Sequence, residues 1–182
     1  MIIGVTGTNG AGKGSLVEYL VKEKGFTHYW VRDFLIAEIT RRGLEVHRGS
    51  MREVANDLRE KHGPSYVVEQ LYAQAVKDGG DAAIESVRVI GEANFLKEHG
   101  ALLIAVDADR HLRYERVVQR GSHTDKVDFD TWVMEEEREW HNEAAHDMNV
   151  PGVMKMADYT IQNDGTPEEL YTKIDAMLAT IG

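Results

Sequence analysis

The sequence contains no cysteine and only three prolines, and no apolar run in it is long enough to cross a membrane. The absence of cysteine excludes disulfides, thiolate metal ligands, a cysteine nucleophile and a thiol redox switch. With no secretory signal pattern either, we expect a cytoplasmic protein without a membrane partner. Basic residues are also few: 21 Lys and Arg stand against 31 Asp and Glu, a net charge of −10. We therefore expect no nucleic-acid partner.

Apolar segments of strand length alternate with longer segments of helical periodicity, which is typical of an α/β fold with a parallel sheet. No repeat or linker divides the 182 residues, so we expect a single domain over residues 1–182. Strands are predicted at residues 2–6, 27–31, 82–87, 101–106 and 159–162.

Two helix starts carry capping signals. Ser50 and Glu53 predict a capping box that opens a helix towards His62. Residues 166–169 predict another start, with a cap, a proline in the first turn and an acid placed to reach back.

A glycine-rich segment lies between the first predicted strand and an amphipathic helix, which is the context that a phosphate-binding loop requires. Its N–H groups would hold phosphate oxygens, and Lys13 would reach the β- and γ-phosphates. A plain glycine-rich turn with a surface lysine is the alternative. The nucleotide-binding residues predicted here are Gly7, Asn9, Gly10, Ala11, Gly12, Lys13, Gly14 and Ser15.

Charged residues follow the predicted strands, and ligands of parallel sheets collect at the carboxyl ends of the strands. Each residue alone is equally well explained as loop polarity, but together with the glycine loop they predict one charged crevice. The residues at these ends are Arg32, Asp33, Glu85, Arg88, Asp107 and Asp109.

Arg113, Arg116 and Arg120 fall on one stripe of the helix predicted after the fourth strand. Pairing with acids such as Glu115 and Asp109 is one explanation. In a chain of net charge −10 the clustering needs a further reason, and Arg116 and Arg120 resemble the lid arginines of nucleotide kinases, which bind ATP phosphates and pack on adenine.

These motifs, in this order along the chain, resemble those of adenylate kinase-like P-loop kinases. Gly14, where most P-loops have a hydroxyl, followed by Ser15, resembles the loop of adenylate kinases. The segment from Glu85 to Arg88 resembles their Asp-Gly-x-x-Arg or Asp-Gly-x-Arg stretch. Residues 157–165 resemble a stretch of dephospho-CoA kinases and of an uncharacterised archaeal group of adenylate kinase-like proteins.

The resemblance implies a three-layer α/β/α P-loop fold with a five-stranded parallel sheet, a helical acceptor-binding region at about residues 32–77 and a lid at about 121–149. It also implies specific roles. The implied catalytic residues are Lys13, Arg88, Arg116 and Arg120, and the implied ATP contacts are Arg116, Arg120, Asn163 and Gly165. The implied acceptor-binding residues are Arg32, Asp33, Arg41, Arg42 and Arg88. A mainly water-mediated Mg²⁺ site is implied at Ser15 and Glu85.

Two departures leave the acceptor unidentified. Ile36 stands where such families often carry an arginine, and Arg32 stands where they carry a glycine. We therefore expect acceptor-phosphate binding to differ in detail, with Arg32, Arg41 or Arg42 as substitutes. A solvated basic helix end explains Arg41 and Arg42 equally well.

The lid segment contains an acidic run that is typical of a solvated helical face. Arg138 within this run is a further candidate for binding phosphate. His141 and His146 are five residues apart and point in different directions on a helix, so with His123 they do not predict a zinc site.

We expect an ATP- and Mg²⁺-dependent kinase that moves the γ-phosphoryl group of ATP to a small acceptor, above all a nucleoside monophosphate. One alternative is a dephospho-CoA kinase, favoured by residues 157–165 and disfavoured by Gly14. Another is a nucleotide-binding module that hydrolyses ATP without transfer. The oligomeric state is not predicted.

Overall fold

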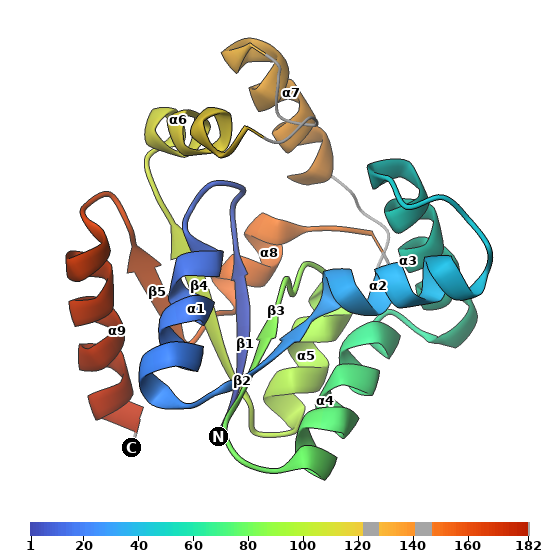
Figure 1. Cartoon of the computed structure of the whole chain (residues 1–182), viewed down its shortest axis with the longest axis horizontal. Coiled ribbons are helices and arrows are strands. Elements are labelled where there is room, and N and C mark those ends of the chain that lie inside the picture. Colours follow the sequence, from blue (N-terminus) through green and yellow to red (C-terminus); the bar gives the residue numbers. More distant parts are fainter. Residues whose placement is uncertain (122–127, 141–146, 182) are drawn as a thin grey trace.

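Within residues 1–121, 128–140 and 147–181, which the computed structural model describes, five strands form one parallel sheet in the order β2-β3-β1-β4-β5. Figure 1 shows this sheet between helices on both sides. The strands are β1 Ile2–Gly7, β2 Thr27–Trp30, β3 Ala82–Glu85, β4 Leu102–Asp107 and β5 Tyr159–Gln162. The predicted α/β fold is confirmed.

Helices connect the strands and cover both faces of the sheet, which is the arrangement of crossover units. The described helices are α1 Lys13–Lys24, α2 Val31–Arg41, α3 Arg48–His62, α4 Tyr66–Asp78, α5 Ile90–Glu98, α6 Arg110–Arg120, α7 Phe129–Trp140, α8 Val150–Lys155 and α9 Pro167–Ile181. Among these, no helix has the length and the apolar character that a membrane span requires.

Alternate residues of the strands belong to two different hydrophobic cores, as the pleat requires. Ile3 and Val5 of β1 pack with α1 and α9. Ile84 of β3 and Leu103 of β4 point to the opposite face and pack with α4 and α5. The three-layer α/β/α arrangement follows from these two cores.

The strand order brings the carboxyl ends of three strands together. β1 lies between β3 and β4, and Val5 of β1 is opposite both Glu85 and Ile104. The loop after β1 therefore begins beside the last residues of β3 and β4. Helices α6 and α7 lie beyond this end of the sheet (Figure 1).

Two strands end earlier than predicted. β3 stops at Glu85 instead of residue 87, because Ser86 has a φ of 77° and cannot continue an extended strand. β2 stops at Trp30, and Val31 already belongs to α2. The chain therefore leaves the sheet directly after Glu85 in β3 and shortly before Arg32 and Asp33 after β2, and these three are residues of the predicted site.

The predicted start of the helix at Ser50 is wrong. α3 begins at Arg48, with His47 as its N-cap. His47 Nδ1 accepts the N–H of Ser50 at 3.1 Å, and Ser50 Oγ accepts the N–H of His47 at 3.0 Å. An imidazole thus caps the helix, and Ser50 is the third helical residue of this capping box.

The predicted start of the last helix is confirmed. α9 begins at Pro167, and Thr166 and Glu169 form the expected capping box. The N–H of Thr166 donates to Glu169 Oε2 at 3.1 Å, and the N–H of Glu169 donates to Thr166 Oγ1 at 3.3 Å.

Some predictions for the lid segment fall outside the described residues. These concern His123, His141 and His146 and the side chain of Arg138. The described part of the lid segment contains α7, whose Trp132 is buried and anchors the helix.

Candidate functional site

The loop between β1 and α1 has a backbone that only glycine accommodates at two positions. Gly10 and Gly12 have φ values of 79° and 100°, in the left-handed region. A Cβ at Gly10 would overlap the carbonyl oxygen of Arg113, and one at Gly12 would overlap the side-chain amide of Asn163. The loop is therefore tightly curved and closely surrounded by other segments.

The amino end of α1 is open for a ligand. Gly12 is the N-cap, so no side chain caps the helix, and its first turn contains no acidic residue. Gly14 and Ser15 in this turn are exposed, and a Cβ at Gly14 would meet nothing within 4 Å. The first N–H groups of the helix have no partner within the helix and are suited to bind an anion.

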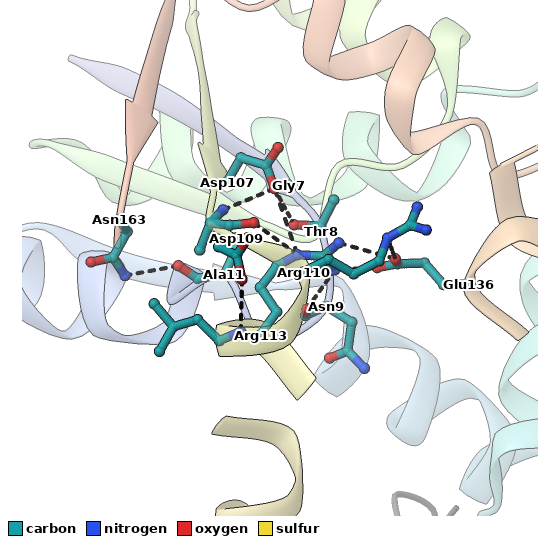
Figure 2. A network of polar contacts seen from close by, with 12 residues as sticks. Gly7, Thr8, Asn9, Ala11, Asp107, Asp109, Arg110, Arg113, Glu136 and Asn163 are labelled. Atoms are coloured by element: carbon teal, nitrogen blue, oxygen red, sulfur yellow. Dashed lines mark hydrogen bonds and ion pairs between the residues drawn. The ribbon is translucent and has the colours of Figure 1, made fainter. Parts of the chain in front are cut away.

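Two side-chain hydrogen bonds connect the loop to the residue after β5 and to the end of β4 (Figure 2). Asn163, which follows β5, donates from Nδ2 to the carbonyl oxygen of Ala11 at 2.8 Å. Thr8 Oγ1 donates to Oδ1 of Asp107, at the end of β4, at 2.7 Å. Asn163 thus uses its side-chain amide to position the loop.

Arg113 of α6 is buried and connects the loop to α7 (Figure 2). Its guanidinium donates to the carbonyl oxygens of Asn9 and Ala108 at 3.1 Å. It also pairs with both carboxylate oxygens of Glu136 and lies 5.1 Å from the ring of Trp132. Arg113 does pair with acids, but these are Glu136 of α7 and, at 3.8 Å from Nε, Asp107 at the end of β4.

Lys13 is the centre of a cluster of positive charge. Its Nζ donates to the carbonyl oxygens of Gly7 at 3.0 Å and Thr8 at 2.7 Å. Burial, followed by repulsion from Arg88, lowers the pKa of Lys13 to about 7, and Arg120 acts in the same direction. The predicted catalytic residues Arg88 and Arg120 therefore lie close enough to Lys13 for their charges to act on it.

Glu85 at the end of β3 is the acidic member of this cluster. It is 7% exposed, and its Oε2 lies 2.9 Å from Nε2 of His28 on β2. It also acts on Lys13, whose pKa it raises against the effects of burial and Arg88. Ser86, next in the chain, has its strained φ at the position where the resembling families have glycine.

A magnesium ion would have few direct ligands from the protein. Among the described residues, no group of three or more His, Asp or Glu side chains is placed to hold a metal ion. Glu85 is a buried carboxylate beside Lys13, and Ser15 is an exposed hydroxyl in the first turn of α1. This donor set fits an ion that is carried mainly by phosphate oxygens and water, as Mg²⁺ commonly is.

Arg116 lies against the loop that follows β5. It donates from Nη1 to the carbonyl oxygen of Asn163 at 2.8 Å and from Nη2 to that of Gly165 at 3.4 Å. Three residues predicted to contact ATP are thereby brought together. Because Asn163 also holds Ala11, this group is directly connected to the glycine loop.

The segment that carries Arg88 is anchored by a buried ion pair. Glu92 of α5 is fully buried and accepts the N–H groups of Arg88 at 2.9 Å and Val89 at 3.2 Å. Its other oxygen accepts Nη2 of Arg59, from α3, at 2.8 Å. Glu92 thus connects the predicted acceptor-binding region to the backbone of Arg88.

Arg41 and Arg42 make ion pairs of their own at the end of α2. Both bind the carboxylate of Glu38, and Arg42 also binds Asp57 of α3 at 2.7 Å. They line a cavity of about 490 Å³ between α2, α3 and the start of α4, and the glycine loop does not contribute to its lining. These pairs connect α2 to α3.

Arg32 and Asp33 lie in the first turn of α2 and are exposed. The guanidinium of Arg32 lies 5.8 Å from the ring of Trp30. Trp30 in turn lies 5.8 Å from the ring of His28, the partner of Glu85. Arg32 is therefore linked to Glu85 through two rings.

Sequence reasoning did not assign several residues that hold the site in place. These residues act through aromatic and carboxylate contacts between elements that are distant in the sequence, and such contacts produce no recognisable local sequence pattern. Asp107 was noted at a strand end and Arg113 on the arginine stripe, but their partners were not foreseen. The residues without an assigned role are Thr8, His28, Arg59, Glu92, Asp107, Arg113 and Glu136.

Comparison with known families gives a match over most of the chain. A family model described as an AAA domain matches residues 3–149. A UPF0200 protein of Thermococcus gammatolerans is 30% identical over 188 aligned positions, covering 100% of this chain and 95% of the relative. One from Sulfurisphaera tokodaii is 30% identical and covers 99% of this chain and 97% of the relative.

Solved structures with a similar fold include small-molecule kinases. The shikimate kinase of Bacteroides thetaiotaomicron superimposes with a TM-score of 0.59 at 12% identity, over 98% of both chains. That of Aquifex aeolicus gives a TM-score of 0.54 at 17% identity, over 99% of this chain and 97% of the other. At these identities the likeness establishes the fold, that of the P-loop kinases.

Proposed function

The chain belongs to the AAA domain family and to the UPF0200 proteins, and from its kinase-like fold and glycine loop we propose that it is an ATP-dependent phosphotransferase that moves the γ-phosphoryl group to a small acceptor. The acceptor that we propose is a nucleoside monophosphate. The sequence motifs that resemble adenylate kinases support this choice, together with the placement of Arg88 beside Lys13.

The observation that carries the proposal is the charge around Lys13. The N–H groups of an uncapped helix, the Lys13 ammonium and two arginines from distant segments surround one place. Burial, followed by repulsion from Arg88, lowers the pKa of Lys13, so an anion that restores the charged form would be favoured there. The triphosphate of ATP is an anion of suitable charge and length for this arrangement.

The remaining parts of ATP would contact the segment after β5. Arg116 and the backbone at Asn163 and Gly165 lie together on the side of the loop next to Ala11. The planar guanidinium of Arg116 is suited to pack against a purine ring. This placement supports binding of the adenine at Arg116.

Transfer of the phosphoryl group would depend on alignment and charge neutralisation, because the protein forms no covalent intermediate. Lys13 and Arg120 would hold the β- and γ-phosphates, and Arg88 would bind the acceptor phosphate or the transferring group. Glu92 fixes the backbone of Arg88 and so orients it. When bound, Mg²⁺ would neutralise phosphate charge, with Glu85 and Ser15 near its water ligands.

A second acceptor class is the hydroxyl group of dephospho-CoA. Residues 157–165 favour it, since they resemble a stretch of dephospho-CoA kinases. Gly14 disfavours it, because that family usually has serine or threonine there. A nucleotide-binding module that hydrolyses ATP without an acceptor is the non-kinase alternative.

An assay of ADP formation with a panel of acceptors separates these possibilities. The panel contains the nucleoside monophosphates, dephospho-CoA and shikimate, the last because a structural neighbour was solved in complex with it. We expect turnover that depends on a nucleoside monophosphate. Turnover with dephospho-CoA alone would make dephospho-CoA the acceptor in place of a nucleoside monophosphate. Slow ATP hydrolysis that no acceptor changes would identify a nucleotide-binding module without transferase activity.

The variant Lys13→Ala tests the site itself. Removing one preorganised donor of this kind costs about 3–4 kcal/mol of transition-state stabilisation, on the order of a few hundredfold in rate. We expect such a loss in kcat with the preferred acceptor. Near-normal turnover by this variant would refute the role of Lys13.

A further inference from the structure

Glu85 is a buried carboxylate that interacts with two basic side chains from different elements. Its Oε2 lies 2.9 Å from Nε2 of His28 on β2. Lys13 is close enough to Glu85 for the two charges to interact. Among the described residues, however, no ion pair joins Glu85 to Lys13, whose Nζ donates to carbonyl oxygens of Gly7 and Thr8 instead.

Strand pairing explains why His28 and Glu85 meet. In the register of β2 with β3, Trp30 is opposite Glu85, and His28 is two residues earlier on the same face. Ala83, two residues before Glu85, packs in the core that contains the buried face of α1. Glu85 and His28 thus point towards the side of the sheet from which Lys13 enters the site.

Without His28, Lys13 is a cation close enough to Glu85 to interact with it. A buried carboxylate requires hydrogen-bond donors, and a lysine side chain is long and flexible enough to turn towards it. A direct Lys13–Glu85 pair would compete with phosphate for the same ammonium group. It would also bring negative charge closer to the place where phosphates bind.

We propose that His28 is a positioning residue that holds Glu85 away from Lys13 and so keeps Lys13 available for the phosphates of a nucleotide. The ring of Trp30, 5.8 Å from that of His28, limits the orientations that the imidazole can adopt. This inference rests on the proposed binding of ATP at the glycine loop.

The test measures ATP affinity by titration calorimetry at constant pH in EDTA, so that any role of Glu85 towards Mg²⁺ does not contribute. His28→Ala should weaken ATP binding roughly five- to tenfold, the effect of losing about one good charge-assisted contact. His28→Gln should stay within about twofold of the wild type, because its side-chain amide retains a donor.

The double variant His28→Ala/Glu85→Gln provides the decisive comparison. Once Glu85 is neutral it no longer attracts Lys13, so the double variant should bind ATP as well as Glu85→Gln alone. Equal affinities of the wild type and His28→Ala would overturn the inference. So would a loss in His28→Ala that persists in the double variant, because His28 would then act through the fold.

Two controls separate this inference from the proposed function. Thermal unfolding of each variant is compared with the wild type, and His28, which is about one-third exposed, should tolerate substitution. If the wild type itself binds no ATP in EDTA or in Mg²⁺, the proposed function fails and the inference with it. If the wild type binds and His28→Ala binds equally well, the inference alone fails.

Discussion

Lys13 is the residue at which burial and neighbouring charge act most strongly on the site. Burial and Arg88 lower its pKa to about 7 in the free protein. Bound phosphate groups would attract the charged form and raise the pKa again. Between pH 7 and about 10, the free protein would therefore hold a largely neutral Lys13 and the ATP complex a charged one.

This difference predicts proton uptake on binding. At pH 8 the complex should take up about one proton, because Lys13 becomes protonated as the phosphates bind. Titration calorimetry in buffers of different ionisation enthalpy gives this number from the slope of heat against buffer enthalpy. Lys13→Arg, which stays charged at all these pH values, should take up none. A wild-type slope of zero would contradict the lowered pKa.

Ser86 is the one non-glycine residue with a positive φ among the described residues. An L-residue in this region is strained by about 1 kcal/mol relative to glycine. Ser86→Gly should therefore raise the free energy of unfolding by about that amount, measured by urea denaturation. Ser86→Ala keeps a Cβ and should not show this gain. A Ser86→Gly variant less stable than the wild type would disprove the strain.

At the scale of elements, α6 and α7 form one unit over the glycine loop (Figure 1). The rings of His111 and Phe129 stack at 4.4 Å, and Tyr114 contacts both Phe129 and Trp132. The Arg113–Glu136 pair then connects this unit to the loop backbone at Asn9. The position of α7 is thereby coupled to the loop that would bind phosphates.

The buried Arg113–Glu136 pair gives a prediction with a neighbouring control. Glu136→Ala removes the acid that contacts the buried Arg113 guanidinium with both carboxylate oxygens and leaves it with the more distant Asp107, 3.8 Å from Nε. The free energy of unfolding should fall by about 3 kcal/mol. Glu137→Ala, at the next residue of α7, removes an exposed ion pair with Arg110 and should change the free energy of unfolding by less than about 1 kcal/mol. Denaturant unfolding measures both, and equal losses would contradict the importance of burial.

A second comparison separates the pair from its packing. Arg113→Leu/Glu136→Leu removes both buried charges, and the two charged groups that lose a contact, Asp107 and Arg110, are partly exposed. This double variant should therefore be more stable than Glu136→Ala. It also removes the contact with the carbonyl oxygen of Asn9, so ATP affinity should fall despite the better stability. An unchanged affinity would show that the loop does not depend on α6.

At the scale of the whole molecule, the site joins segments from β1 to the loop after β5, so a ligand bound there should stabilise the entire fold. At about 100 times the dissociation constant, ATP should add about 2.7 kcal/mol. For a chain of this length that raises Tm by several degrees, which scanning fluorimetry measures. Lys13→Ala should show a smaller rise at the same ATP concentration. A wild-type Tm indifferent to ATP would contradict binding.

Much of the fold is predictable from short-range patterns. The glycine spacing and the flanking apolar periodicities identify β1, the loop and α1, because those features lie within about 25 consecutive residues. The boundaries at Val31, Ser50 and Ser86 were not predictable in the same way. Histidine is an uncommon N-cap and serine rarely has a positive φ, so residue propensities do not predict the cap at His47 or the backbone of Ser86.

For the site, the residue types suited to phosphate binding could be read from the chain, whereas their partners in the fold could not. Lys13, Arg88 and Arg116 carry chemistry that is evident from type and position relative to a strand end or helix face. Glu136 as the partner of Arg113, and His28 as the partner of Glu85, depend on strand order and helix packing. Contacts between elements tens of residues apart arise only when the chain is folded, because local periodicity carries no information about which elements become neighbours.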